Sequence, residues 1–344
     1  MHDKDEPDRG TVLTANQLRR ELRQAGVANA AVDAVWPEWW SADAANSMSA
    51  TAELTYTVAR RLGMSPTALF DGSPEFLWRD ETKFKNLGTT SEREQAILAS
   101  FGTAVGRCAI RATPVEGSLA ELPDLAHVRE IILAAAQFVE LREILNLCWA
   151  IRIPVIQLEV FALRQKRMQA MTVRLEDRHA ILLGRQSSFY AQTAFVIGHE
   201  LAHIALGHLA NDTNLLDIED LLTTSEKDGE EIDADHEALM LLTGDRDPQV
   251  VPDADQFTGQ QLVKAALQAS AGGRIEPGTL ALCAGYATKR WPQTFAALRG
   301  LPPGRQNVGQ QINDLATSQF SWSELSYGNR QYLAQVIGRD YAAA

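Results

Sequence analysis

One stretch of the sequence carries metal-binding and proton-transferring residues at the spacing that such chemistry requires. It reads His199-Glu200-Leu201-Ala202-His203. Residues four apart lie on one face of an α-helix, so His199 and His203 would offer two imidazole nitrogens to one ion. Glu200 would lie within reach of a metal-bound water and would take its proton. The pattern predicts a zinc site in which Glu200 is the general base of a hydrolytic reaction.

A catalytic zinc ion takes a third protein ligand and keeps one position open for water. Downstream, residues 230–238 are rich in acidic side chains, and Glu231 and Asp235 share one helical face. We expect Glu231 to be the third ligand and Asp235 to accept a hydrogen bond from the distal nitrogen of one imidazole. Glu230 and Asp233 remain alternative ligands.

The residues after the second histidine exclude one further zinc pattern. A metzincin motif would need Gly and His where the sequence has Leu206 and Leu209. His208 lies five residues after His203, about 140° further round a helix. We therefore predict that His208 is a helix-end residue that points away from the site.

Hydrolysis also needs a group that stabilises the transition state, and the sequence offers two candidates. These are His236, which follows Asp235, and Tyr190, which precedes the motif by nine residues. For His236 a surface position is the alternative interpretation, and for His179, in a predicted strand, a structural role is expected.

The three cysteines, Cys108, Cys148 and Cys283, lie far apart and show no Cys-x-x-Cys spacing. Such a sparse, odd set is typical of reduced thiols in a cytosolic protein. We interpret each as a small buried hydrophobic residue. An alternative is that one thiolate occupies the open zinc position and restrains the enzyme.

Composition bounds the class of protein. The chain has 344 residues, 45% hydrophobic and 22% charged, with a formal net charge of −12. That balance is typical of a globular protein with a sizeable core. The acidic excess disfavours sequence-independent binding to nucleic acid or to anionic membranes. The polar N-terminus does not have the pattern of a signal peptide, and no apolar run is long enough to span a membrane. We expect a cytoplasmic protein.

Hydrophobic periodicity predicts a mainly helical chain with three short strands. Residues 73–90 are predicted as a loop and residues 114–124 as a linker. We expect strands at 153–161, 170–176 and 179–184, and helices at 15–35, 91–106, 126–150, 188–210, 214–224, 229–243, 254–270, 278–290, 308–318 and 322–338. Residues 50–70 are predicted as helix, turn and helix, in which Gly63 ends the first helix and Ser65-Pro66 begins the second.

These elements suggest four regions. We predict a disordered tail at residues 1–12, a helical N-terminal domain at 13–125, a metal-binding core at 126–250 and a helical C-terminal region at 251–344.

The segment from residue 150 to 243 resembles the ImmA/IrrE family of zinc metallopeptidases. The resemblance is carried by the motifs Ile153-Pro154-Val155, Gly184-Arg185-Gln186-Ser187-Ser188, Thr193-Ala194-Phe195-Val196, His199 to His208 and the acidic helix with Glu231. Asp233 replaces a second Glu of the family pattern, and Glu237 stands where Phe is common. These departures leave the third ligand in place.

The resemblance implies an α+β, predominantly helical fold. Its zincin-like core would have a small mixed β-sheet packed on the HExxH helix, flanked by helical N- and C-terminal regions, and an edge strand that pairs with an extended peptide. Family members bind one catalytic Zn²⁺ and cleave a helix-turn-helix repressor, which switches on stress, mobile-element or defence genes.

The N-terminal region is similar, more distantly, to the helix-turn-helix of XRE-type regulators. Residues 58–69 carry this similarity, but no long third helix with base-reading side chains follows. With the acidic balance, this favours a docking or regulatory module over direct DNA binding.

The sequence supports two hypotheses about the function of the protein. The first is a zinc metalloendopeptidase that cleaves a partner regulatory protein, which the acidic chain would attract if that partner is basic. The alternative is a non-catalytic or DNA-binding regulator that retains a zincin fold and acts through residues 15–110. Glu200 argues against the alternative, because a binding module has no need of a general base.

Overall fold

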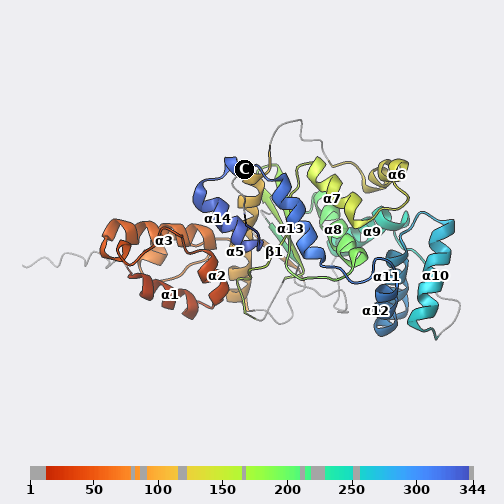
Figure 1. The fold of residues 1–344 in the computed structure, drawn as a ribbon, viewed down its shortest axis with the longest axis horizontal. Helices are drawn as coiled ribbons and strands as arrows, with labels where there is room; N and C mark the ends of the chain where they lie inside the picture. The colour runs from red at the N-terminus through yellow and green to blue at the C-terminus, as the bar shows by residue number, and fades with distance from the viewer. Residues whose placement is uncertain are drawn as a thin grey trace, which may run out of the picture.

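The computed structural model describes residues 13–78, 82–85, 91–114, 122–164, 168–209, 214–217, 229–250 and 256–340. The tail predicted at residues 1–12 lies outside these. Figure 1 shows an elongated molecule, with a β-sheet in its middle, the N-terminal helices at one end and a small helical group at the other. The mainly helical chain with one mixed sheet confirms the predicted α+β class.

The sheet contains five described strands in the order β1-β5-β3-β4-β2. β3 pairs antiparallel with β4 and β5, whereas β2 is parallel to β4 and β1 is parallel to β5. Their bounds are β1 (Thr82–Lys85), β2 (Val155–Gln157), β3 (Ala170–Leu175), β4 (Arg178–Leu183) and β5 (Asn214–Asp217). β2, β3 and β4 confirm the three predicted strands.

The other two strands correct the sequence prediction. The helix predicted at 214–224 is wrong at residues 214–217, which form β5, and the loop predicted at 73–90 contains β1. Apolar spacing after residue 214 resembles that of a helix. However, β5 pairs with β3 over four residue pairs and so satisfies backbone groups of an otherwise open strand edge. Long-range pairing of this kind outweighs a local pattern.

The sheet ends at β1 on one side and at β2 on the other. β3 is not an edge strand, because β5 covers it. At β2, the side chain of Asn313 accepts a hydrogen bond from the Gln157 N–H and donates one to the Gln157 carbonyl, both at 2.8 Å. Among the described strands, β1 provides the remaining edge.

Side chains of β3 alternate between two hydrophobic clusters on opposite faces of the sheet. Met171 and Val173 join the cluster that includes α5 (Glu92–Ala112), whereas Ala170 joins the cluster that includes α8 (Tyr190–Ala205). α5 approaches β3 closely at Gly106, where a Cβ atom would lie 2.6 Å from a methyl carbon of Val173. No side chain fits at residue 106 without a shift of its neighbours.

The N-terminal helices begin and end at residues that the sequence marks for those roles. Ser65 caps the N-terminus of α4 with Pro66 in its first turn, and Gly63 ends α3 in a left-handed conformation. The bounds are α1 (Ala15–Gln24), α2 (Asn29–Ala34), η1 (Ala44–Asn46), α3 (Met48–Leu62) and α4 (Pro66–Phe70).

The single helix predicted at 126–150 is wrong, because two helices replace it. α6 ends at Ala135 and α7 begins at Leu141, and between them Val139 is buried with 1% exposure. Burial of Val139 favours a turn between the two helices, although no Gly or Pro in the sequence indicates one there. The remaining bounds are α6 (Leu125–Ala135), α7 (Leu141–Ala150), α9 (Gly229–Thr243), α10 (Gly259–Gly272), α11 (Pro277–Thr288), α12 (Trp291–Gly300), α13 (Val308–Gln319), η2 (Trp322–Glu324) and α14 (Tyr327–Val336).

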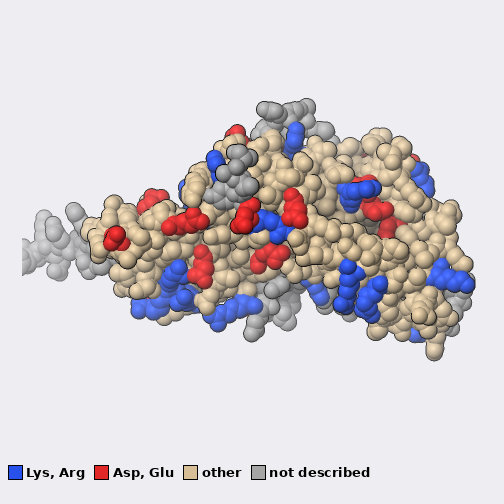
Figure 2. Space-filling model, in the orientation of Figure 1, with Lys and Arg blue, Asp and Glu red and all other residues tan. Residues whose placement is uncertain are grey.

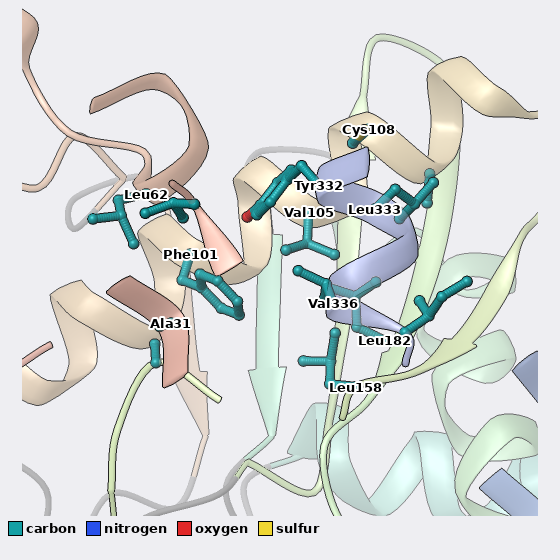
Figure 3. Packing of buried hydrophobic residues seen from close by; sticks show 14 of the residues in the cluster. Ala31, Leu62, Phe101, Val105, Cys108, Leu158, Leu182, Tyr332, Leu333 and Val336 are labelled. Atoms are coloured by element: carbon teal, nitrogen blue, oxygen red, sulfur yellow. The ribbon is translucent and has the colours of Figure 1, made fainter. Parts of the chain in front are cut away.

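One hydrophobic cluster joins regions that the sequence analysis assigned to three different units. Figure 3 shows Leu62 of the N-terminal helices, Phe101 of α5, Leu182 of β4 and Tyr332 of α14 within this cluster. The Tyr332 hydroxyl also donates a 2.7 Å hydrogen bond to the Arg61 carbonyl. The N- and C-terminal regions are therefore packed on the sheet, and the domain boundaries at 125 and 250 stay predictions. No helix of the described residues combines the length and apolar character needed to cross a membrane.

Candidate metal centre

Helix α8 brings the HExxH motif into the interior between the sheet and α9. Glu200 and His203 have no exposed surface, and His199 is 6% exposed. Small buried residues of α9, Ala234 and Ala238, allow the two helices to lie close together. Burial of ionisable groups costs free energy unless they have partners, so these side chains must interact with one another or with an ion.

The two imidazoles and one carboxylate converge on a single point. The Nε2 atoms of His199 and His203 lie 3.0 Å apart, and each lies 3.3 Å from an oxygen of Glu231. A tetrahedral zinc ion bonded at about 2.0–2.1 Å holds its donor atoms about 3.3–3.4 Å apart. His199 faces Oε2 and His203 faces Oε1 of Glu231, at separations close to those between the donors of one zinc ion. This triangle of three buried side chains, two His and one Glu, has the residues to hold a metal ion.

The electrostatics of the group favour positive charge at its centre. Burial alone would lower the pKa of His199, but hydrogen bonds to Asp235 and Glu231 outweigh burial and raise the pKa to about 10. Burial lowers the pKa of His203 to about 4. The bonds from both histidines hold the pKa of Glu231 well below its usual range, although burial opposes them. The carboxylates thus stabilise a cation at this position.

The outer nitrogens of both imidazoles also have partners. His199 Nδ1 lies 2.9 Å from Asp235 Oδ1, in the position predicted from the sequence. His203 Nδ1 lies 2.7 Å from Nδ1 of His208. The prediction that His208 points elsewhere is wrong, because α8 ends at Ala205 and the helical projection no longer applies beyond it.

Glu200 is held by a residue that the sequence analysis did not identify. The hydroxyl of Thr172 on β3 donates a hydrogen bond to Oε2 of Glu200, and both residues are fully buried. The one available signal was a polar residue within the apolar run of β3. Such a residue must find a partner, but the sequence does not say which helix lies over it.

The other predicted residues lie outside the donor triangle. Of the three acidic ligand candidates on α9, Glu231 faces the imidazoles, whereas Asp233 is exposed and Glu230 is partly buried. His236 is partly buried beside Asp235 and is not one of the converging residues.

Tyr190 and His179 also lie away from the triangle. The Tyr190 hydroxyl donates a 2.5 Å hydrogen bond to Gln311, and nine residues of helix, about 13 Å of rise, separate Tyr190 from His199. His179 lies on β4 opposite Arg174, and burial lowers its pKa to about 4.

The three cysteines are free and buried, and none belongs to the metal-binding group found among the described residues. Burial raises the pKa of Cys108 and Cys283 to about 12 and raises the pKa of Cys148 further. These thiols stay protonated, which argues against a thiolate that restrains the site.

A cavity of about 450 Å³ includes two neighbours of His199 in its lining. Asp235 and Phe195 line it together with Cys283 and Tyr286 of α11. The rings of Phe195 and His199 lie 6.4 Å apart between centroids, and those of Phe195 and Tyr286 lie 6.0 Å apart. The helical group of α10–α12 therefore reaches the surroundings of the metal-binding group through α11.

Comparison with known proteins adds no relative: no family model matches the chain, and neither curated proteins nor solved structures show a significant match.

Proposed function

We propose that the protein is a zinc-dependent metallopeptidase of the ImmA/IrrE type. The observation that supports this most directly is the buried triangle of His199, His203 and Glu231, with the carboxylate of Glu200 on the same helix. Its donor separations suit zinc, and its charge pattern favours a cation. The same residues carry the sequence resemblance.

Each residue would have a distinct role. His199, His203 and Glu231 would hold the ion, and Asp235 would fix the orientation of the His199 ring through its Nδ1 atom. When bound, zinc supplies Lewis-acid polarisation of a peptide carbonyl and acidifies water. Glu200 would accept the proton of the attacking water and deliver it to the departing amine.

Thr172 would orient the general base. Its hydrogen bond to Oε2 of Glu200 would fix the plane of the carboxylate. The burial of both side chains keeps bulk solvent away from the proton transfer.

The proposed substrate is a regulatory protein of the helix-turn-helix repressor class, as the resemblance suggests. With a net charge of −12 the chain would attract a basic DNA-binding partner. Figure 2 shows acidic and basic side chains interspersed over one face rather than separated. Any attraction across that face would therefore be diffuse. The three free, buried cysteines fit action in the reducing cytoplasm.

The N-terminal helices give little support to the alternative of direct DNA binding. α4, which follows the turn at Gly63, has only five residues, so it is short for a helix that reads bases in the major groove. We assign the N-terminal helices a role in docking or support of the sheet.

The test is cleavage of a helix-turn-helix repressor encoded beside this gene, followed by mass spectrometry of the products. We expect the zinc-loaded protein to cut the repressor and Glu200→Gln to lower the rate by about 10²–10⁴-fold, because the general base is lost. Glu130→Gln, which changes an exposed glutamate of α6, is the matched control. Equal cleavage by Glu200→Gln and the wild type would contradict the mechanism.

A further inference from the structure

His208 is the residue whose position departs most from the helical pattern of the motif. Gly207 adopts φ +72° directly after α8, and the His208 N–H donates a 3.0 Å hydrogen bond to the His203 carbonyl. This left-handed helix end folds the chain back over the last turn. The imidazole of His208 consequently reaches the imidazole of His203 and does not continue round the helix.

If Nε2 of His203 binds the metal, it is settled which ring donates the hydrogen bond between His203 and His208. That nitrogen faces His199 Nε2 and Glu231, so it must be free of a proton to bind a metal. A neutral His203 then carries its proton on Nδ1 and donates it to His208 Nδ1, 2.7 Å away. His208 must accept there and therefore carries its own proton on Nε2.

We propose that His208 is a positioning residue that sets the tautomer and ring orientation of His203 and thereby raises zinc affinity. The two ligand histidines would thus be held by different means, His199 by the carboxylate of Asp235 and His203 by a third imidazole. Outer partners of ligand histidines contribute about 10–100-fold to metal affinity. This inference rests on the proposed zinc site and does not require that the protein be a peptidase.

A substitution at Gly207 tests the same contact independently, because it changes the position of His208 without removing the imidazole. Among the described residues no atom lies within 4 Å of the position that a Cβ of residue 207 would take, so a side chain there meets no clash with this part of the chain. Only its positive φ resists substitution, most strongly for a β-branched residue. Gly207→Val would therefore move residue 208 away from His203 although residue 208 is still a histidine, whereas Gly207→Asn tolerates the left-handed conformation.

The experiment measures zinc dissociation constants of the full chain at one pH by competition with a chromophoric chelator. We expect His208→Ala and His208→Gln to weaken zinc binding by about 10–100-fold. His208→Asn should stay within about threefold, because its amide oxygen can take the place of Nδ1 as acceptor. Gly207→Val should weaken binding and Gly207→Asn should not. His127→Ala, which removes an exposed imidazole from α6, is the matched control.

Thermal unfolding of the metal-free variants separates this role from a general structural one. The backbone bond from residue 208 to His203 does not depend on the side chain, so the metal-free His208 variants should stay folded at the temperature of the titrations. Gly207→Val should melt at a lower temperature than these variants, because its side chain strains the positive φ. Nitrogen-15 spectra of the zinc-loaded wild type should show a proton on His203 Nδ1 and on His208 Nε2. Unchanged zinc affinity in His208→Ala overturns the inference alone, whereas failure of the wild type to bind zinc overturns the proposed function as well.

Discussion

The two faces of the central sheet bury different chemistry although one strand contributes to both. On the α5 face, Met171 and Val173 of β3 belong to an apolar cluster, in which Val173 lies against Gly106. On the α8 face, Thr172 bonds the buried Glu200 beside the two histidines. The first face gains stability from close packing, whereas the second must offset the desolvation of ionisable groups. Changes on one face should therefore alter stability, and changes on the other should alter metal binding.

The largest expected effect is loss of metal affinity on the α8 face. Glu231→Gln keeps the shape of the side chain but removes the negative charge from the third ligand. We expect zinc affinity to fall by more than about 100-fold, because loss of a ligand costs more than loss of an outer contact. Calorimetric titration checks this.

Glu230→Gln provides a matched control for that substitution. Glu230 precedes Glu231 on α9 and lies outside the donor triangle, so its substitution should leave zinc affinity unchanged. Equal losses in the two variants would show that net charge, rather than ligation, governs binding.

The next effect should appear on the α5 face as a loss of stability alone. In Gly106→Val the new side chain has no room beside Val173, since even a Cβ would lie 2.6 Å from its methyl carbon. We expect the free energy of unfolding to fall by about 2–3 kcal/mol, as overpacked cores show. Denaturant titration measures the change.

The folded fraction of Gly106→Val should still bind one zinc ion with wild-type affinity. Gly272→Ala, at a position with open space around a Cβ, should change stability little. A drop in zinc affinity without a drop in stability would mean that the two faces are coupled through β3.

Much of the chemistry of the α8 face could be predicted from the sequence, because a helix fixes which residues share a face. His199, His203 and Glu231 converge as the spacing predicted, and Asp235 takes the predicted place. The positions of these four side chains depend on the helical geometry of α8 and α9 and on the packing of these two helices against each other.

The unpredicted parts depend on where a regular element stops or on which strands meet. His208 was misplaced because the helical projection was continued past Ala205, where the chain turns at Gly207. Thr172 was missed because its partner comes from a helix 28 residues further along. β5 was predicted as a helix because its local spacing says nothing about the strand edge that it covers.

The smallest expected effect tests whether the polar contact of β3 distinguishes the faces. Thr172→Val preserves shape and deletes the hydroxyl that bonds the buried Glu200 carboxylate, so we expect a loss of about 1.5–2 kcal/mol in unfolding free energy. Thr172→Ser should restore most of it. On the other face, the buried hydroxyl of Thr103 donates to the Ala99 carbonyl at 2.7 Å within its own helix.

The same exchange, Thr103→Val, should therefore cost less than about 1 kcal/mol, because the Ala99 carbonyl keeps its backbone partner. Urea titrations of the three variants at neutral pH make the comparison. If Thr103→Val lowers the free energy of unfolding as much as Thr172→Val, the decrease is general for a buried hydroxyl. The hydrogen bond to Glu200 then contributes no more than the one within α5. A larger loss at Thr172, recovered by Ser, would show that β3 stabilises the charged carboxylate on the face where the ligands lie.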